Sequence, residues 1–117
     1  MGYGNAMKST SANPTRFEKT VYNAVKLIPR GRVSTYRAVA EKTGCRSCQA
    51  VGQALKRNQN SPIIPCHRVI SSNLTIGGFM GKRTGQAVKR KISLLSKEGV
   101  KFESGQLVDP SRLFIFK

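Results

Sequence analysis

Residues 34–57 read STYRAVAEKTGCRSCQAVGQALKR, and this stretch predicts two short helices joined by a turn that contains a glycine. Ser34 or Thr35 can cap the first helix, and Gly44 can end it. The second helix is expected to begin near Ser47. Its apolar face consists of Ala50, Val51, Ala54 and Leu55, and its polar face of Gln49, Gly52, Gln53 and Lys56. The pattern suggests a helix-turn-helix, with an ordinary amphipathic helix on a small domain as the alternative.

The flanking residues predict two further helices and a hairpin. Thr15 and Glu18 have the spacing of a capping box, so a helix is expected from there to about Leu27. Another is expected over about residues 85–97, followed by Gly99 as its left-handed terminal residue. The runs 100–102 and 106–108 flank a turn and predict a small hairpin. We expect residues 1–14 to be a flexible lead and residues 15–117 a single, mainly α domain.

The composition is strongly basic. The chain has 117 residues with 21 Lys+Arg against 5 Asp+Glu, a formal net charge of +16. Such a charge favours a polyanionic partner, above all nucleic acid. A solubilising surface or an anionic membrane is the alternative, but no segment has the form of a basic amphipathic helix with a broad apolar face. Three cysteines cannot all pair within one chain, which favours a reducing, intracellular compartment such as cytoplasm or nucleus.

The candidate reactive stretch is Pro65-Cys66-His67-Arg68-Val69. Cysteine reacts as its thiolate, so a neighbouring base that takes the thiol proton activates it. His67 is the only histidine of the chain and lies beside one of three cysteines. Taken alone, the adjacency fits a buried structural cysteine beside a hydrogen-bonded histidine equally well.

From about Phe17 to Phe102 the chain resembles the C-terminal, DNA-binding domain of the O6-alkylguanine-DNA alkyltransferases. The common N-terminal domain of that family has no counterpart here. Each motif that carries the resemblance is short, but together they occur in the order and at the spacing of the family. They are Gly31-Arg32-Val33-Ser34-Thr35-Tyr36, Ala50-Val51-Gly52-Gln53-Ala54, Asn58, Ile64-Pro65-Cys66-His67-Arg68-Val69, Leu94-Leu95 and Glu98-Gly99.

The resemblance implies a winged helix-turn-helix-like fold and a DNA repair protein that flips an alkylated guanine out of the duplex. The alkyl group would pass irreversibly from O6 to Cys66, once per molecule. His67 would relay the proton through a water and Glu98 would orient the imidazole. Tyr36 would contact the phosphate and help to rotate the nucleotide, and Asn58 would brace the active-site turn. No cofactor or metal is implied, and a monomer is expected.

The resemblance also implies which residues contact DNA and substrate. The polar face of the second helix would lie along the minor groove of double-stranded DNA, where base readout is degenerate and a repair protein needs no sequence preference. The DNA contacts would come from Tyr36, Arg46, Gln49, Gly52, Gln53, Arg57 and Arg68. The pocket for the alkylated base would be lined by Val69, Phe79 and Met80.

Three departures from the family pattern matter. At the position of Gln49 the family usually has an arginine that fills the vacated base stack, and Arg46 is the candidate substitute. At Phe79 it usually has a tyrosine whose hydroxyl contacts O6. The segment between Phe79 and Glu98 is longer than usual.

Two other interpretations fit parts of the sequence. Alkyltransferase-like proteins bind alkylated DNA without repairing it and typically have tryptophan in place of the acceptor cysteine. Here the position is Cys66 and the chain has no Trp, which favours the transferase. A zinc site from Cys45, Cys48, Cys66 and His67 has the right Cys-x2-Cys spacing, but adjacent Cys66 and His67 rarely ligate one ion together.

Overall fold

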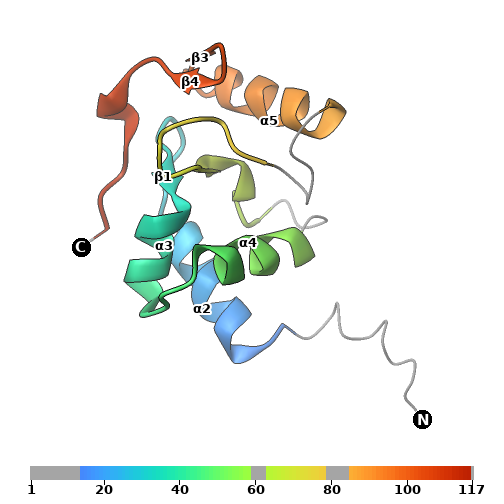
Figure 1. Ribbon diagram of the computed structural model, residues 1–117, viewed down its shortest axis with the longest axis vertical. Coiled ribbons are helices and arrows are strands. Elements are labelled where there is room, and N and C mark those ends of the chain that lie inside the picture. The colour runs from blue at the N-terminus through green and yellow to red at the C-terminus, as the bar shows by residue number, and fades with distance from the viewer. Residues whose placement is uncertain (1–13, 59–62, 79–84, 117) are drawn as a thin grey trace.

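The computed structural model describes residues 14–58, 63–78 and 85–116. Its first three helices gather in one half of the molecule, and the last helix lies with the hairpin in the other half (Figure 1). The C-terminal segment returns beside the first half (Figure 1). The flexible lead predicted over residues 1–14 lies outside the described part of the chain, apart from Pro14.

Helix α2 spans Arg16–Val25, and its start is fixed by the predicted capping box. The Thr15 hydroxyl accepts from the Glu18 amide, and the Glu18 carboxylate accepts from the Thr15 amide, both at 3.0 Å. These two bonds satisfy amide donors that the first turn of a helix leaves without partners. The helix ends at Val25, slightly earlier than predicted, and a turn carries the chain to buried Ile28.

The predicted helix pair is present as α3, Tyr36–Thr43, and α4, Cys48–Arg57. Thr35 caps α3 and Ser47 caps α4, each accepting a backbone amide hydrogen bond on its side-chain oxygen. Gly44 ends α3 in the left-handed conformation at φ 75°, which a residue without Cβ adopts at low cost. Because α2 packs on both helices, the unit is a three-helix, helix-turn-helix-like arrangement.

A short parallel pair of strands links this unit to the reactive stretch. Strand β1, Ser34–Thr35, pairs with β2, Val69–Ile70, in the register Ser34 to Val69 and Thr35 to Ile70. Cys66–Arg68 form a single 3-10 turn immediately before β2. The start of α3 and the Cys66 turn are therefore held side by side, although they lie far apart in the sequence.

The second half of the molecule is α5, Gln86–Lys97, with the hairpin of β3, Phe102–Glu103, and β4, Gln106–Leu107. Gly99 follows α5 at φ 87°, as predicted, and the hairpin turns at Ser104 and Gly105. One core fills the three-helix unit, and a second joins Val33 and Ile70 to α5 and the hairpin. The tail packs on the first core through Phe114 and Phe116.

These observations confirm the predicted fold class, mainly α with a small hairpin and a helix-turn-helix-like unit. Among the described residues, no helix has the length and apolar character needed to cross a membrane.

Candidate active site and DNA-facing helix

Cys66 begins the 3-10 turn between the two cores and packs against the three-helix unit. Asn58, the residue that ends α4, donates from Nδ2 to the Cys66 Sγ at 3.4 Å. The thiol also points at the Leu55 carbonyl, 3.9 Å away. The end of α4 therefore contacts the sulfur through Asn58.

Burial dominates the electrostatics of this thiol. Removal from water raises the pKa of Cys66, because a thiolate is poorly stabilised away from solvent. The hydrogen bond from Asn58 and the positive charge of Lys91 act in the opposite direction. In the resting site the thiol of Cys66 is therefore protonated. A base and favourable charges are needed to form the thiolate.

His67 and Glu98 are brought together across the junction between the 3-10 turn and α5. His67 Nε2 lies 2.9 Å from Glu98 Oε2, and the two side chains are 16% and 7% exposed. Burial is the main reason that the pKa of His67 is lowered, so the imidazole is neutral at pH 7. With Glu98 as acceptor, Nε2 carries the proton and Nδ1 is left as the basic nitrogen.

Arg68 departs from its expected role as a DNA contact. Its guanidinium donates from Nε and Nη2 to the two oxygens of Glu98, both at 3.0 Å. Nη1 donates to the Ile28 carbonyl at 2.9 Å, and the side chain is only 17% exposed. A guanidinium engaged in this way fixes the carboxylate instead of reaching a phosphate. We therefore assign Arg68 to holding Glu98 in place.

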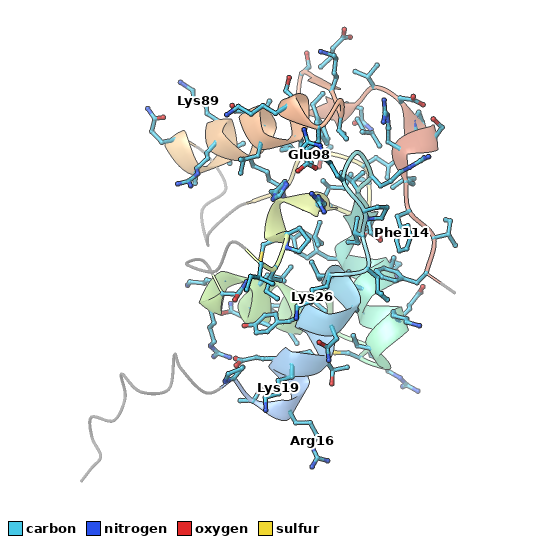
Figure 2. All side chains as sticks on the ribbon, turned by 180° about the vertical axis from the view of Figure 1, so that it is seen from behind. Arg16, Lys19, Lys26, Lys89, Glu98 and Phe114 are labelled. Carbon is cyan, nitrogen blue, oxygen red and sulfur yellow. The ribbon has the colours of Figure 1, made fainter. Side chains whose placement is uncertain are left out.

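The Glu98 carboxylate is consequently ionised throughout the physiological range. Burial alone would raise its pKa, but the hydrogen bonds from Arg68 and His67 outweigh burial and hold the pKa at about 2. Glu98 is the C-cap residue directly after α5, and it lies where that helix meets the body of the molecule (Figure 2). This placement explains why a residue distant in sequence reaches the Cys66 turn.

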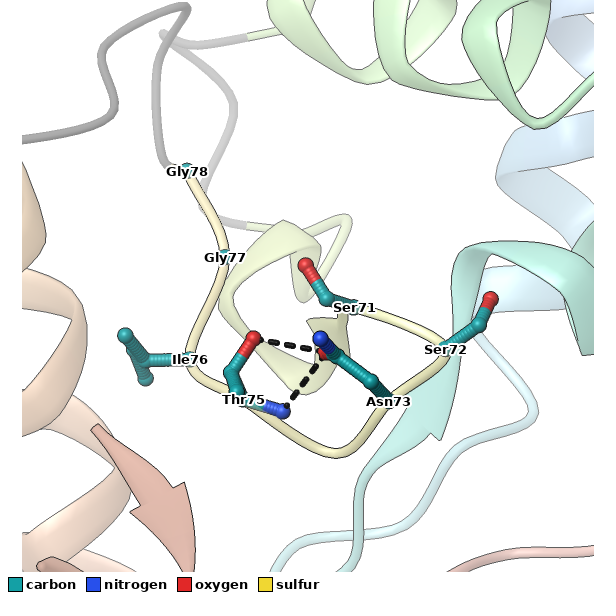
Figure 3. Close-up of a pocket in the computed structure, with 7 residues that line it drawn as sticks. All are labelled: Ser71, Ser72, Asn73, Thr75, Ile76, Gly77 and Gly78. Atoms are coloured by element: carbon teal, nitrogen blue, oxygen red, sulfur yellow. Dashed lines mark hydrogen bonds between the residues drawn. The ribbon is translucent and has the colours of Figure 1, made fainter. Parts of the chain in front are cut away.

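Tyr36, the first residue of α3, lies against the loop that follows β2. Its hydroxyl donates to the Gly78 carbonyl at 3.4 Å. This loop borders an open hollow of about 570 Å³, lined mainly by small polar residues and backbone (Figure 3). The lining residues are Ser71, Ser72, Asn73, Thr75, Ile76, Gly77 and Gly78. Asn73 Oδ1 accepts from the amide and hydroxyl of Thr75, which fixes the tip of the loop (Figure 3).

Lys91 is a buried lysine beside the candidate site that the sequence motifs do not predict. It is fully buried, and its Nζ donates to the Val69 carbonyl at 2.7 Å and the Gly78 carbonyl at 2.8 Å. A signal was present in the sequence. Lys91 follows Val88 by three residues and precedes Leu95 by four, so it lies on the inward face of α5.

The outer face of α4 has the open, polar character that the sequence predicts. Gln49 and Gln53 are exposed, and nothing lies within 4 Å of where a Cβ at Gly52 would be. Arg46 is exposed just before the helix. Arg57, at the far end, pairs with Glu18 at 2.7 Å but remains 65% exposed. A rod-like partner can therefore approach this helix closely.

Two predicted pocket residues, Phe79 and Met80, lie outside the described residues. Val69 is buried in β2, so it presents its backbone carbonyl and not its side chain to the Lys91 amine.

Within the described part of the chain, no three His, Cys, Asp or Glu side chains gather as metal ligands. Cys45 and Cys48 flank the cap of α4 and do not join Cys66 and His67 in a zinc site.

Taken together, these features define a helix-turn-helix-like domain that holds a half-buried cysteine next to a histidine–carboxylate pair. Residues 16–100 match the family model of the 6-O-methylguanine DNA methyltransferase DNA-binding domain. The chain belongs to this family.

Relatives and solved structures agree with this assignment. The methylated-DNA–protein-cysteine methyltransferase of Saccharolobus solfataricus is 46% identical over 85 residues, which are 73% of this chain and 52% of that protein. The chain thus spans about half the length of such curated relatives. The O6-methylguanine-DNA methyltransferase of Pyrococcus kodakaraensis superposes with a TM-score of 0.62 at 40% identity, covering 74% of this chain and 47% of that one.

A second kind of relative is also similar. S. pombe Atl1, solved in complex with damaged DNA containing O6-carboxymethylguanine, superposes with a TM-score of 0.72 at 35% identity. The superposition covers 84% of this chain and 94% of Atl1.

Proposed function

We propose that this chain is a DNA repair protein that transfers the alkyl group of an O6-alkylguanine in double-stranded DNA to its own Cys66. The observation that carries the proposal is that one 3-10 turn holds both the Cys66 thiol, which accepts from Asn58, and His67, whose imidazole contacts Glu98. A nucleophile, a base and a group that orients the base are the parts that such a transfer needs.

The reaction balances without a cofactor. The Cys66 Sγ forms a bond to the alkyl carbon while the bond from that carbon to O6 breaks. The electron pair of the broken bond stays with the guanine, which takes up one proton. The thiol proton leaves through Nδ1 of His67, so the proton lost by the cysteine replaces the alkyl group lost by the base. Because the new thioether is stable, each molecule acts once.

The His67–Glu98 pair supports the proton transfer for a physical reason. A neutral imidazole can accept the thiol proton, and the imidazolium that forms is stabilised by the carboxylate of Glu98. Arg68 keeps Glu98 ionised and correctly oriented. The Glu98 carboxylate therefore does not take the thiol proton from His67. The arrangement therefore favours temporary storage of the proton on His67 and its delivery to the departing guanine.

DNA would bind along α4 from the minor-groove side, with a single protein molecule on each lesion. The open face at Gly52 permits close approach, and Gln49 and Gln53 offer polar contacts that do not depend on sequence. Arg46 and Arg57 are exposed enough to reach phosphates, and Tyr36 begins the neighbouring helix beside the Cys66 turn. With a net charge of +16, affinity for undamaged duplex should fall steeply as salt rises.

The alkylated base would enter beside Tyr36 and the loop of residues 71–78. Val69, Phe79 and Met80 would complete the pocket, and a base rotated out of the stack would meet the Cys66 thiol there. The phenylalanine at position 79 keeps an aromatic surface for the purine and lacks a hydroxyl for O6.

A second candidate function is recognition of alkylated DNA without repair. The similarity to S. pombe Atl1 over 94% of that chain favours it. The decisive difference is chemical, because only a chain with a reactive cysteine can accept an alkyl group. Cys66, half-buried beside Asn58 and next in sequence to His67 of the His67–Glu98 pair, supports the transferase.

Replacing the thiol tests the proposal. Duplex DNA with a single O6-methylguanine is mixed with the protein, and the methylated peptide is located by mass spectrometry. We expect the methyl group on the peptide that contains Cys66, and Cys66→Ser should bind the duplex with unchanged affinity but accept no methyl. Cys45→Ser and Cys48→Ser are the matched controls and should transfer normally. Methylation of Cys45 or Cys48 in the unmodified protein would refute the assignment.

A further inference from the structure

The C-terminal segment, residues 109–116, is built into the body of the protein. The Val33 amide donates to the Arg112 carbonyl at 2.9 Å, and the Phe114 amide donates to the Val33 carbonyl at 2.7 Å. Val33 and Leu113 thus form a parallel bridge directly before β1, where the segment passes the first half of the molecule (Figure 1). The family model ends at residue 100, so this segment lies outside the region that it matches.

The side chain of Arg112 joins this segment to two turns. Its Nη1 donates to the carbonyl of Gly31, which lies in the turn between α2 and β1, at 3.2 Å. A Cβ at Gly31 would lie 3.4 Å from Nη1, and a Cβ at Gly99 would lie 3.5 Å from Nη2. One half-buried guanidinium therefore lies against both the turn that follows α2 and the turn that follows α5.

The backbone of Glu98 is held at the same corner. Its carbonyl lies 3.4 Å from the position that a Cβ of Gly31 would occupy, so the two turns are in close contact. Arg30 Nη2 donates to the Lys97 carbonyl at 3.0 Å. The last carbonyls of a helix have no partners within it, and the helix dipole favours cations at this end. Two guanidiniums thus fix the end of α5, one before Glu98 and one after it.

The end of α5 has to be fixed because the Glu98 side chain reaches a specific nitrogen. Its carboxylate lies 2.9 Å from His67 Nε2. A hydrogen bond of this length is lost when one partner moves away by about 1 Å. A misplacement of that size in an active site can slow a reaction by roughly 100-fold. Arg68 holds the carboxylate from the Cys66 turn, so the backbone of Glu98 has to be fixed from another side.

We infer that Arg112 is a positioning residue of the candidate active site. Its guanidinium joins the turns that follow α2 and α5, and this junction holds the Glu98 carboxylate at His67. The inference rests on the proposed function, in which the carboxylate stabilises the protonated imidazole. It extends the support of the site to a segment beyond the family motifs. The alternative is that Arg112 only anchors the C-terminal segment.

The first test observes His67 directly and needs no DNA. His67 is the only histidine of the chain, so its NMR titration with 15N-labelled histidine is unambiguous. Burial lowers the pKa of His67, and the Glu98 carboxylate raises it. The positive charges of Arg68 and Lys91 act in the same direction as burial. We expect Arg112→Gln to move the midpoint to lower pH, because a displaced carboxylate stabilises the imidazolium less.

Two further variants make this test specific. Arg112→Lys keeps a donor for the Gly31 carbonyl but has no second nitrogen to lie against Gly99. It should move the midpoint in the same direction by a smaller amount, so the test does not depend on whether Arg112→Gln folds. Arg90→Gln, at an exposed residue of α5, is the matched control and should leave the midpoint unchanged. A folded Arg112 variant with an unchanged His67 midpoint would overturn the inference.

The second test is a double-mutant cycle on transfer from duplex O6-methylguanine DNA. If Arg112 acts through Glu98, the effects of the two substitutions are not additive. We expect Arg112→Gln to slow the single-turnover rate about tenfold, because the carboxylate is only partly misplaced. In a Glu98→Gln background the same substitution should have almost no further effect. Equal slowing in both backgrounds would show that Arg112 does not act through Glu98.

These tests separate the inference from the proposed function. The His67 titration reports the placement of Glu98 whether or not the chain transfers an alkyl group. A chain that never transfers would refute the proposed function, and the titration would still decide the role of Arg112. A folded Arg112→Gln variant that transfers at the parent rate would refute only the role of Arg112.

Discussion

The Glu98 carboxylate lies 2.9 Å from His67 Nε2, and the two oxygens of the same group accept both hydrogen bonds of the Arg68 fork. One acidic residue therefore joins two consecutive residues of the Cys66 turn to the end of α5. The chain has only five acidic residues, so the use of one at this point is a specific feature of the site. The consequences concern both proton transfer and stability.

Glu98→Gln should slow transfer much more than it weakens DNA binding. The amide cannot stabilise an imidazolium, so His67 becomes a poorer acceptor of the thiol proton. General acid–base assistance is worth roughly 100-fold or more, and we expect a loss of about that size in the single-turnover rate. The rate is measured with duplex O6-methylguanine DNA. Affinity for the same duplex is measured with Glu98→Gln in a Cys66→Ser background, which cannot transfer the methyl group. Equal rates for Glu98→Gln and the parent protein would assign Glu98 a purely structural role.

Stability in acid should depend on the same carboxylate. The pKa of Glu98 is about 2 in the folded chain against 4.5 ordinarily, so its contribution is fully present above pH 4.5. It is lost as the pH falls toward 2, and we expect it to be roughly 2 kcal/mol after allowance for solvent screening. Urea unfolding at several pH values measures it. Glu98→Gln should remove this part of the pH dependence, whereas Glu103→Gln, at an exposed hairpin residue, should not.

Gln49→Arg should speed transfer from duplex DNA and leave transfer from single-stranded DNA nearly unchanged. Flipping a base costs a few kcal/mol, part of which is recovered by a side chain inserted into the vacated stack. Arginine can fill that space and adds a charge near the phosphates, whereas glutamine is shorter and neutral. Single-turnover rates on the two DNA forms give the comparison.

Arg46→Ala tests whether the exposed Arg46 already has this role. If Arg46→Ala abolishes duplex transfer and Gln49→Arg changes nothing, Arg46 is the inserted residue. If neither variant changes the rate, flipping depends on Tyr36 and the backbone of α4.

The local parts of the fold could be predicted because their causes are local. The capping box of Thr15 and Glu18, the cap at Ser47 and the left-handed Gly44 each depend on residues within a few positions. Short motifs in the sequence predict Cys66, His67, Asn58 and Glu98 as site residues, and in the structure Asn58 contacts Cys66 while Glu98 contacts His67 of the same turn.

The parts that could not be predicted depend on contacts between distant residues. Strands β1 and β2 have two residues each, too few for a periodic pattern, and only their pairing makes them visible. The sequence predicts Arg68 at DNA because arginine in a very basic chain is expected at a phosphate, yet its partners are Glu98 and Ile28. The contacts of Lys91 are not predictable from the sequence, because its two carbonyl partners come from segments whose approach to α5 no local pattern reveals.

The central claim, that Cys66 is a single-use alkyl acceptor, is tested most directly by the intact mass of the protein after mixing with O6-methylguanine duplex. With DNA in increasing excess, we predict that the mass rises by the equivalent of one methyl group and then stays constant, while one lesion is repaired per protein molecule. Cys66→Ser should show no change. An unmodified mass for a protein that binds the duplex, or repair of more lesions than there are protein molecules, would contradict the account.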